Sequence, residues 1–274
     1  MENKNPYLIA FDMDGTLLNE HKKISFKTKK YLRKLTKKGH KIILASGRPS
    51  RALFKYYNDL HLSTPMICYN GAYTFSPNDK DFVTKEFEFP LDITKQLYKE
   101  LKPYSKNFMC ETDKEIWVDK EDQYLAYFFW YENMTIHHGD ISKTLNKNPM
   151  TMIVQLKNMD IDENIIKNIV NKYENLNVRF WTGSPYFEIF YEGTSKGASI
   201  SFIASYYHID KEHIIVFGDA ENDVEMFKVA GNAIAMKNGK DLIKEHAKYI
   251  SLKDNNHNGI YYTLKAFFKN RLMF

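Results

Sequence analysis

The sequence predicts an α/β protein in which a parallel sheet flanked by helices is interrupted by an inserted α+β domain. Toward both ends of the chain, short apolar runs rich in β-branched residues alternate with helical patterns, which is typical of a parallel sheet covered by helices. In the middle of the chain, strand patterns follow one another more closely, and all three tryptophans lie there. A length of 274 residues favours two domains of ordinary size.

The first third of the chain alternates strand and helix patterns. Residues 7–11 are an apolar run that predicts the first strand, and a helix is expected at 25–38. Ser25 suits the start of this helix as a cap, and Gly39 suits its end. The remaining elements expected here are strands at 41–45 and 66–69, a helix at 51–59, and a hairpin around Asn70-Gly71.

The densest basic cluster of the chain, at 22–41, overlaps the first predicted helix. Thr28, Tyr31, Leu32 and Leu35 recur at helical spacing, so the lysines between them are expected on the solvent-facing side of an amphipathic helix. The alternative is a patch that binds nucleic acid. A net charge of +5 is too mild to favour it, because such a protein concentrates basic residues on one surface.

The last third of the chain returns to the alternating pattern. The elements expected there are strands at 213–217 and 232–235 and helices at 198–206, 223–229 and 259–269. Together with the first third, they predict a catalytic α/β core formed by residues 1–81 and 189–274.

Residues 82–188 are expected to form the inserted α+β domain. Turn-forming residues at 76–81 and 191–196 interrupt the periodic pattern and are plausible hinges. The elements expected inside are strands at 106–110, 116–118, 151–156, 178–181 and 187–190, and helices at 92–101, 123–131 and 162–173.

Composition narrows the class of protein. No apolar run reaches the roughly 18 residues that a membrane span requires, and no signal peptide is recognisable at the start of the sequence. Cys68 and Cys110 do not make a disulfide framework, and no residues near them have the spacing of zinc ligands. We therefore expect a cytoplasmic protein with no membrane partner and no obligate protein partner.

Two acidic clusters follow predicted strands. The first strand runs into Asp12-Met13-Asp14-Gly15-Thr16, and the strand at 213–217 runs into Gly218-Asp219-Ala220-Glu221-Asn222-Asp223. An isolated Asp-x-Asp-Gly also fits an Asx turn. Parallel strands, however, place their ends at one edge of a sheet, and carboxylates gathered there repel one another unless a cation lies among them. Hard oxygen ligands favour magnesium over zinc.

Hydroxyl and cationic groups follow two further elements. The strand at 41–45 leads into Ser46-Gly47-Arg48, where a hydroxyl and backbone amides suit an oxyanion. Lys196 lies just before the helix at 198–206, near a helix N-terminus with its own affinity for anions. Carboxylates, a cation site, a serine and a lysine together predict phosphoryl transfer.

These motifs, in this order, resemble those of the haloacid dehalogenase superfamily. Asp-x-Asp-Gly-Thr, Ser-Gly-Arg, a lysine and Gly-Asp-x-x-Asn-Asp each follow a predicted element, and the inserted domain resembles the type II cap, B subclass, of the Cof-type phosphatases. The resemblance covers essentially the whole chain and implies a Rossmann-like core. Ser46 stands where many relatives carry threonine, which keeps the hydroxyl.

The resemblance implies a role for each matching residue. Asp12 would be the nucleophile that becomes an aspartyl phosphate. Asp14 would protonate the leaving oxygen and then activate water. Magnesium would be held by the carboxylates of Asp12 and Asp219 and by the backbone carbonyl of Asp14, with Asp223 orienting metal-bound water.

The same resemblance implies the phosphate-binding residues. Ser46, Lys196 and Asn222 would hold phosphate oxygens, beside the backbone of Gly47, and Thr16 would brace the first loop. Two alternatives stay open. Asn222 and Asp223 also fit a helix N-terminal pair, since one residue can both cap and bind. Arg48 either contacts the phosphate or caps its loop.

Three weaker candidates lie outside these motifs. His137-His138 is an adjacent pair, which is poor metal geometry, and we interpret it as a solvated turn. The aromatic run at 127–131 is interpreted as part of the core of the cap rather than as a substrate site. Tyr69-Asn70-Gly71 follows a core strand, so Asn70 either faces the substrate or simply forms a hairpin turn.

The resulting hypothesis is a Mg²⁺-dependent phosphatase that hydrolyses a small phosphorylated metabolite, such as a sugar phosphate, through an aspartyl-phosphate intermediate. A phosphotransferase or mutase on the same scaffold is the nearest alternative. A non-catalytic regulatory protein that kept the site is a third, which the intact carboxylates and Lys196 disfavour. Nucleic acid is not expected as a partner.

Overall fold

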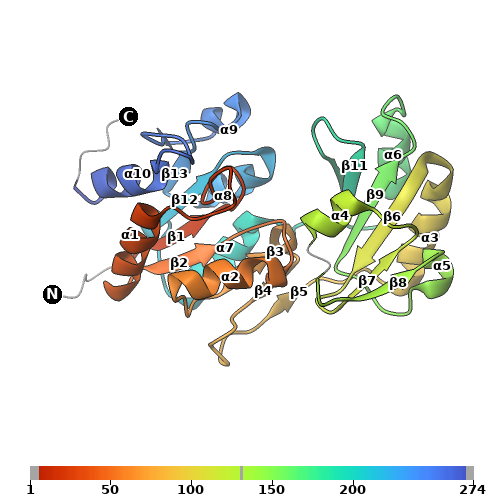
Figure 1. Cartoon of the computed structure of the whole chain (residues 1–274), viewed down its shortest axis with the longest axis horizontal. Coiled ribbons are helices and arrows are strands. Elements are labelled where there is room, and N and C mark those ends of the chain that lie inside the picture. Colours follow the sequence, from red (N-terminus) through yellow and green to blue (C-terminus); the bar gives the residue numbers. More distant parts are fainter. Residues whose placement is uncertain (1–5, 130–131, 270–274) are drawn as a thin grey trace. The chain divides into compact units, whose positions relative to one another are not determined.

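The computed structural model describes residues 6–129 and 132–269. The chain divides into two compact units. The core unit comprises Met1–Thr84 and Ser195–Phe274, and the inserted unit comprises Lys85–Thr194. The last two residues of the helix expected at 123–131 lie outside the described residues. Figure 1 shows the course of the chain through both units.

The core unit is built on a parallel sheet with the strand order β14-β13-β12-β1-β2. Strand β1 lies between β12 and β2, and its residues are completely buried, as an apolar run covered on both faces should be. The strands are β1 (Leu8–Phe11), β2 (Lys41–Leu44), β12 (Ile214–Gly218), β13 (Asn232–Ala235) and β14 (Tyr249–Ile250). This sheet confirms the predicted α/β fold.

Helices cover the core sheet, and the first of them forms as the sequence predicts. Ser25 caps it by accepting a hydrogen bond from the Thr28 amide, and Thr28, Leu32 and Leu35 are its buried side. The lysines therefore lie on its outer side. The helices are α1 (Phe26–Lys37), α2 (Ser50–Leu60), α7 (Lys196–Tyr206), α8 (Val224–Val229), α9 (Asp241–Glu245) and α10 (Gly259–Phe267), with 3₁₀ turns at Lys211–His213 and Glu221–Asp223.

A hairpin follows the second helix of the core unit. Strands β3 (Met66–Cys68) and β4 (Tyr73–Phe75) pair in antiparallel fashion and are joined by a 3₁₀ turn at Tyr69–Gly71. The sequence predicted this hairpin around Asn70-Gly71. Ala45, just after β2, bridges Ile67 in parallel, so β3 extends the order of the core strands beyond β2.

The inserted unit contains a sheet with the strand order β10-β11-β9-β6-β7-β8. Its strands are β6 (Ser105–Glu111), β7 (Glu115–Val118), β8 (Thr135–His138), β9 (Thr151–Leu156), β10 (Leu176–Phe180) and β11 (Tyr186–Tyr191), preceded by the short β5 (Lys85–Glu86). Strand β11 pairs through Tyr191, so the boundary expected at residue 188 falls inside a strand.

The two faces of this sheet are covered differently. Helices α3 (Leu91–Leu101), α5 (Ile141–Thr144) and α6 (Glu163–Val170) pack on one face, around buried Phe108 and Trp117. Helix α4 (Gln123–Phe128) lies on the other face, over Met109 and Ile153 (Figure 1). A 3₁₀ turn at Lys102–Tyr104 follows α3.

One expectation about the inserted unit is wrong, and a second holds only in part among residues 127–129, since residues 130–131 lie outside the described residues. His137-His138 is part of strand β8, not a solvated turn: the His137 ring stacks on Trp117 with centroids 5.0 Å apart, and its Nε2 lies 2.8 Å from Glu115 Oε2. Parallel pairing with β7, which no local pattern shows, decides this. The aromatic run is not uniformly core, because Phe129 is buried whereas Tyr127 is 70% exposed.

None of the helices within residues 6–129 and 132–269 combines the length and the apolar character needed to cross a membrane.

Candidate active site

The predicted acidic residues gather at the carboxyl ends of the central core strands. Asp12 directly follows β1, and Asp219 directly follows the neighbouring β12. The backbone amide of Asp12 donates to the Phe217 carbonyl at 3.0 Å, which continues the strand pairing to the point where the two loops begin. Adjacent parallel strands thus bring together two motifs that are some two hundred residues apart, as ligand sites of open α/β sheets require.

Lys196, the first residue of α7, joins the two acidic motifs. Its Nζ lies 2.5 Å from Asp12 Oδ1 and 2.7 Å from Asp223 Oδ1, and the lysine side chain is completely buried. Burial alone would lower the pKa of Lys196, but the charges of Asp12 and Asp223 outweigh it and hold this pKa above its ordinary value. The lysine is therefore a fixed positive charge.

Oxygen atoms of Asp12, Asp219 and Asp223 all lie within 4.8 Å of one another. Burial raises the pKa of Asp12 well above its usual range, and the charges of Asp223 and Asp219 add to this although Lys196 opposes it. Burial, with the Asp223 charge, also raises the pKa of Asp219 to about 6, against the hydrogen bond from Thr16. One lysine does not neutralise three carboxylates, so the oxygen donors fit a hard divalent cation.

Asp223 is held in place by the loop that it terminates. Its Oδ2 accepts hydrogen bonds from the amides of Asp219, at 2.9 Å, and Ala220, at 3.1 Å, while its other oxygen receives Lys196. Asp223 therefore closes the turn that precedes α8 and also faces the cluster, although its side chain does not cap α8. Thr16 donates from Oγ1 to Asp219 Oδ1 at 2.5 Å and so ties the first loop to the last.

Asp14 points to a different set of partners. Arg48 donates from Nε and Nη2 to its two carboxylate oxygens, each at 2.6 Å, and Lys22 Nζ lies 2.6 Å from Oδ1. Burial alone would raise the pKa of Asp14, but the hydrogen bonds and charges of Arg48 and Lys22 lower it below its usual value. Arg48 is expected from the sequence either to contact the phosphate or to cap its loop; its guanidinium instead pairs with the Asp14 carboxylate of the first loop.

Sequence reasoning missed Lys22. Its place in the basic cluster at 22–41 groups it with the lysines of the first helix, although it precedes that helix in a turn with φ of 55°. Its position in the sequence could have identified it, because Lys22 lies eight residues after Asp14 and before the predicted helix cap Ser25. Tyr56 fixes this turn by donating from its hydroxyl to the Lys22 carbonyl at 2.9 Å.

The polar groups expected around a phosphate also lie side by side. Ser46 Oγ accepts from the Arg48 amide at 3.1 Å, and the Ser46 carbonyl accepts from the Asn70 amide at 3.0 Å. Asn222 Nδ2 donates to Asn70 Oδ1 at 3.0 Å. A Cβ on Gly47 would lie 3.0 Å from the side-chain nitrogen Nδ2 of Asn70, so Gly47 permits this close approach.

Gly15 has a stricter requirement. Its φ is +79°, and a Cβ there would lie 2.4 Å from Asp219 Oδ2. Only glycine lets the first loop turn against this carboxylate. The structure thus brings Asp12, Asp219, Asp223 and Lys196 into one cluster, to which Thr16 is tied through Asp219. A second group comprises Ser46, Gly47, Asn70 and Asn222, and Asp14 pairs separately with Arg48 and Lys22.

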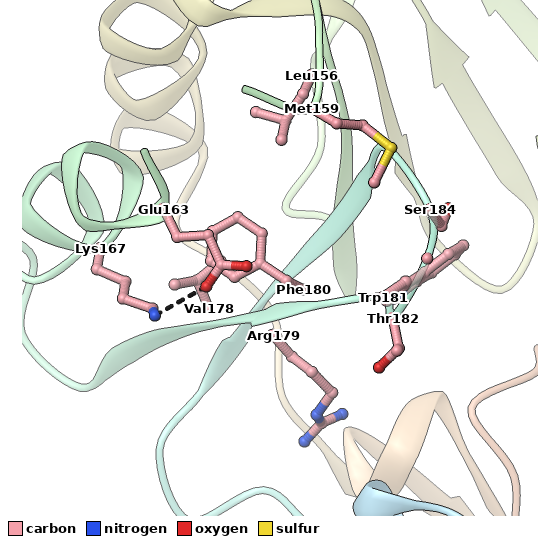
Figure 2. Close-up of a pocket in the computed structure, with 11 residues that line it drawn as sticks. Leu156, Met159, Glu163, Lys167, Val178, Arg179, Phe180, Trp181, Thr182 and Ser184 are labelled. Carbon is pink, nitrogen blue, oxygen red and sulfur yellow. Dashed lines mark hydrogen bonds and ion pairs between the residues drawn. The ribbon is translucent and has the colours of Figure 1, made fainter. Parts of the chain in front are cut away.

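A separate cavity of about 560 Å³ lies in the inserted unit, and none of the predicted site residues lines it. Figure 2 shows it between α6 and the β10–β11 hairpin, with Lys167 paired to Glu163 at 3.0 Å beside Phe180. Arg179 also lines the cavity and pairs with Glu188, so both of these lining cations already have carboxylate partners and the cavity lacks the anion-binding character of the core site.

Known proteins resemble the chain over nearly its whole length. The sequence model of the haloacid dehalogenase-like hydrolases matches residues 9–264. The chain is 32% identical over 272 residues to the 5-amino-6-(5-phospho-D-ribitylamino)uracil phosphatase YitU of Bacillus subtilis, covering 98% of this chain and 99% of the relative. It is 27% identical over 248 residues to YcsE of the same organism, which has the same enzyme name, covering 89% of each.

A solved structure supports the fold. The subclass IIB sugar phosphatase BT4131 of the same superfamily superposes with a TM-score of 0.79 at 23% identity, covering 95% of this chain and 98% of that one.

The sequence model of the family matches the chain from β1 to α10, through the strands and loops that carry the acidic motifs. The chain therefore belongs to the haloacid dehalogenase-like hydrolases, among their Cof-type phosphatases.

Proposed function

We propose that the protein is a Mg²⁺-dependent phosphatase that hydrolyses a small phosphorylated metabolite through an aspartyl phosphate on Asp12. The observation that carries this proposal is the buried cluster of Asp12, Asp219 and Asp223 around the ammonium of Lys196. Charge neutralisation and in-line positioning are the main requirements of phosphoryl transfer.

In the first step, a carboxylate oxygen of Asp12 bonds to phosphorus while the bond from phosphorus to the leaving oxygen breaks. Asp14 gives that oxygen a proton. In the second step, water attacks the phosphorus, Asp14 takes the proton of the water, and the bond from phosphorus to Asp12 breaks. The carboxylate of Asp12 and inorganic phosphate are the products.

Asp14 needs a proton before the first step, whereas Arg48 and Lys22 stabilise its ionised form. A phosphate dianion that arrives beside them attracts both cations and adds a negative charge next to Asp14. Both effects raise the pKa of this carboxyl. Substrate binding thus favours the protonated Asp14 that the leaving oxygen requires.

Mg²⁺ would be held by the carboxylates of Asp12 and Asp219 and by the backbone carbonyl of Asp14, with Asp223 orienting these ligands. It would supply the positive charge that lets a phosphate approach the three carboxylates. Lys196, Ser46 and Asn222 would bind phosphate oxygens, next to Gly47, and Asn70 would hold Asn222 through their 3.0 Å hydrogen bond.

The relatives suggest the substrate class. YitU and YcsE are both named for 5-amino-6-(5-phospho-D-ribitylamino)uracil, and YitU matches 98% of this chain. We propose that this chain acts on the same kind of molecule, a phosphate monoester at the end of a sugar-alcohol chain. We also propose that the inserted unit is a cap that sets the choice among such esters.

A panel of phosphorylated metabolites tests the proposal. Specificity constants would be measured with Mg²⁺ for the ribitylaminouracil ester, several sugar phosphates and pyridoxal phosphate, with Asp12→Asn as the inactive control. The expected result is phosphate release at a specificity constant at least about tenfold higher for the first ester. No release from any ester contradicts the phosphatase; release at equal constants contradicts the substrate class. Phosphate appearing on an added alcohol rather than in water would identify a phosphotransferase.

A further inference from the structure

Two asparagines that follow β13 in the core unit hold the first loop of the candidate active site. Asn238 Nδ2 donates to the Gly15 carbonyl at 2.8 Å, and Asn255 Nδ2 donates to the Leu18 carbonyl at 2.8 Å. The two residues also contact each other, because the backbone amide of Asn255 donates to Asn238 Oδ1 at 3.1 Å. A backbone amide only donates and a carbonyl only accepts, so these contacts fix the orientation of the Asn238 side-chain amide. We call Asn238 and Asn255 the asparagine clamp.

The part of the first loop that the clamp holds carries Asp14. Gly15 directly follows Asp14 and has a φ of +79°, and its peptide group rotates freely unless a contact holds it. Leu18 forms an isolated parallel bridge with Asp14, so a shift of Leu18 moves Asp14 as well. Lys22, the ion-pair partner of Asp14, lies in the next turn of the same loop. The clamp thus contacts the backbone on both sides of the segment that positions this carboxyl group.

Asp12 is held by other elements. Its backbone amide donates to the Phe217 carbonyl of β12 at 3.0 Å, and its carboxylate receives the ammonium of Lys196 from α7 at 2.5 Å. These contacts come from the core sheet and from α7, and neither involves the clamp. Loss of the clamp should therefore disturb Asp14 more than Asp12.

The clamp is itself anchored to the rest of the core unit. On one side of Asn238, the amide of Lys237 donates to Ser251 Oγ, just after β14, at 2.9 Å. On the other side, the amide of Lys240 donates to the Asp219 carbonyl at 3.1 Å. The segment that carries Asn238 is thus fixed to the sheet edge and to the second acidic loop, so it imposes a position on the first loop instead of following it.

We propose that Asn238 and Asn255 are positioning residues for the acid-base chemistry: they hold the first loop so that the Asp14 carboxyl reaches the leaving oxygen and, later, the attacking water. The inference rests on the proposed function, which gives Asp14 this role. Proton transfer requires hydrogen-bond distance, and a displacement of about 1 Å is enough to lower a rate by about a hundredfold.

The test compares two esters that differ in their need for an acid. p-Nitrophenyl phosphate loses its leaving group without protonation, whereas ribitol 5-phosphate needs a proton from Asp14. The variants are Asn238→Ala and Asn255→Ala, measured at saturating Mg²⁺. Asn238 is exposed and Asn255 is half-buried, so neither substitution leaves a cavity in the apolar core.

Asn232→Ala is the matched control. Asn232 begins β13, and its Nδ2 donates to the Glu212 carbonyl at 2.8 Å. This bond also joins an asparagine side chain to a backbone carbonyl within the core unit, but it lies at the amino ends of the core strands, opposite the candidate active site. The control should lose stability without distinguishing the two esters.

Each clamp variant is expected to lower the specificity constant for ribitol 5-phosphate about tenfold and to leave that for p-nitrophenyl phosphate within about twofold of the parent value. In rapid-mixing experiments with the aryl ester, release of phosphate should slow about tenfold relative to release of p-nitrophenol, because Asp14 also activates the water. Equal losses for the two esters, or no loss for either, overturns the inference.

Hydrogen exchange separates this inference from the proposed function. The amides of Leu17 and Leu18 donate to the carbonyls of Asp12 and Met13, and they should exchange faster in Asn255→Ala than in the parent, whereas the amides of β1 should not. If the parent hydrolyses neither ester but the loop exchanges faster in the variant, the proposed function fails while the asparagines still hold the loop. Unchanged exchange in a protein that hydrolyses both esters overturns the clamp and leaves the phosphatase intact.

Discussion

Asp12 and Asp14 are separated by one residue but have different surroundings. Asp12 faces the buried ammonium of Lys196, whereas Asp14 faces Arg48 and Lys22 on the more accessible side of the loop. Successive residues of an extended segment point in opposite directions, but residues two apart point the same way. The turn that begins at Asp14 therefore separates the two carboxyl groups, and separation permits two chemical roles.

Asp12 and Asp14 should be distinguishable in pre-steady-state kinetics. Asp12→Asn is expected to abolish even the first phosphoryl transfer, because no carboxylate attacks phosphorus. Asp14→Asn should still react with p-nitrophenyl phosphate, whose leaving group departs without protonation. The base for the second step is missing, so a burst of p-nitrophenol stoichiometric with enzyme should precede a slow phase.

An alkyl phosphate provides the control for this experiment. Its alkoxide needs a proton in order to leave, so Asp14→Asn should show no burst with it. Peptide mapping of the trapped phosphate should identify Asp12. The assignment of roles fails if the two variants behave alike toward the aryl ester, or if the phosphate maps to another residue.

Lys196 should be needed for stability as well as for activity. Lys196→Met leaves the buried Asp12 and Asp223 without their shared counter-charge, and breaking a buried ion pair in this way costs about 3–5 kcal/mol. Urea denaturation in the presence of a chelator measures the loss. Asp223→Asn in the same background should recover part of it, since it removes one of the two repelling charges; no recovery would contradict the electrostatic explanation.

At the scale of elements, the turn after β3 joins three parts of the site. Tyr69, Asn70 and Gly71 have φ of 48°, 53° and 104° in succession, an unusual run for two residues with side chains. The turn brings the Asn70 amide to the Ser46 carbonyl and its side chain to Asn222. Gly71 in turn lies against the Ser195 carbonyl, at the start of α7.

Gly71→Ala should therefore destabilise the protein more than its backbone angle alone explains. A Cβ there would lie 2.4 Å from the Ser195 carbonyl oxygen, which would have to shift together with Lys196. Backbone strain of about 1 kcal/mol and overpacking of about 1–3 kcal/mol add together. Urea denaturation and specificity constants should both show the loss.

Gly39→Ala is the matched control for this variant. Gly39 has a comparable φ of +90°, but nothing lies within 4 Å of the position that a Cβ would take. It should lose only about 1 kcal/mol of stability and keep full activity. Equal losses in the two variants would mean that the contact with Ser195 does not matter.

At the scale of the whole molecule, the site depends on segments from both ends of the chain. Asp12 precedes the inserted unit in the sequence, whereas Lys196, Asp219 and Asp223 follow it. A bound cation links these segments only in the folded protein. Cation binding and stability of the core unit are therefore coupled.

Mg²⁺ should stabilise the protein, and chelator should abolish its phosphatase activity. At a hundred times the dissociation constant, binding to the folded state alone adds about 2.7 kcal/mol, which a thermal shift assay detects. Asp219→Ala should lower the specificity constant at least about a hundredfold, or roughly 3 kcal/mol of transition-state stabilisation. Full activity in a rigorously metal-free preparation would contradict the proposed cofactor.

Asp219→Asn supplies a control in which stability is expected to increase without Mg²⁺. Burial and the Asp223 charge raise the pKa of Asp219 to about 6, so its ionised form destabilises the folded protein at neutral pH when no cation is bound. Removing that charge should raise stability in chelator and also eliminate the response to Mg²⁺. A variant that still responds to Mg²⁺ would show that the cation binds elsewhere.

The core fold and the clustering of the acidic motifs could be predicted from local sequence. Ser25 and the periodic apolar residues after it determine the first helix, and buried apolar runs determine strands such as Leu8–Phe11. Asp12 and Asp219 follow such runs directly. Because parallel strands end at one edge of a sheet, their proximity follows once the alternating pattern is recognised.

Tertiary structure alone decided the partners of each side chain. Lys22 pairs with Asp14, and His137 lies in a strand stacked on Trp117, because segments distant in sequence pack against them. Tyr124 is half exposed beside buried Phe129 for the same reason. A local pattern records whether a residue is apolar and how often it recurs, whereas ion pairs, ring stacks and edge strands depend on which surface the rest of the chain brings to it.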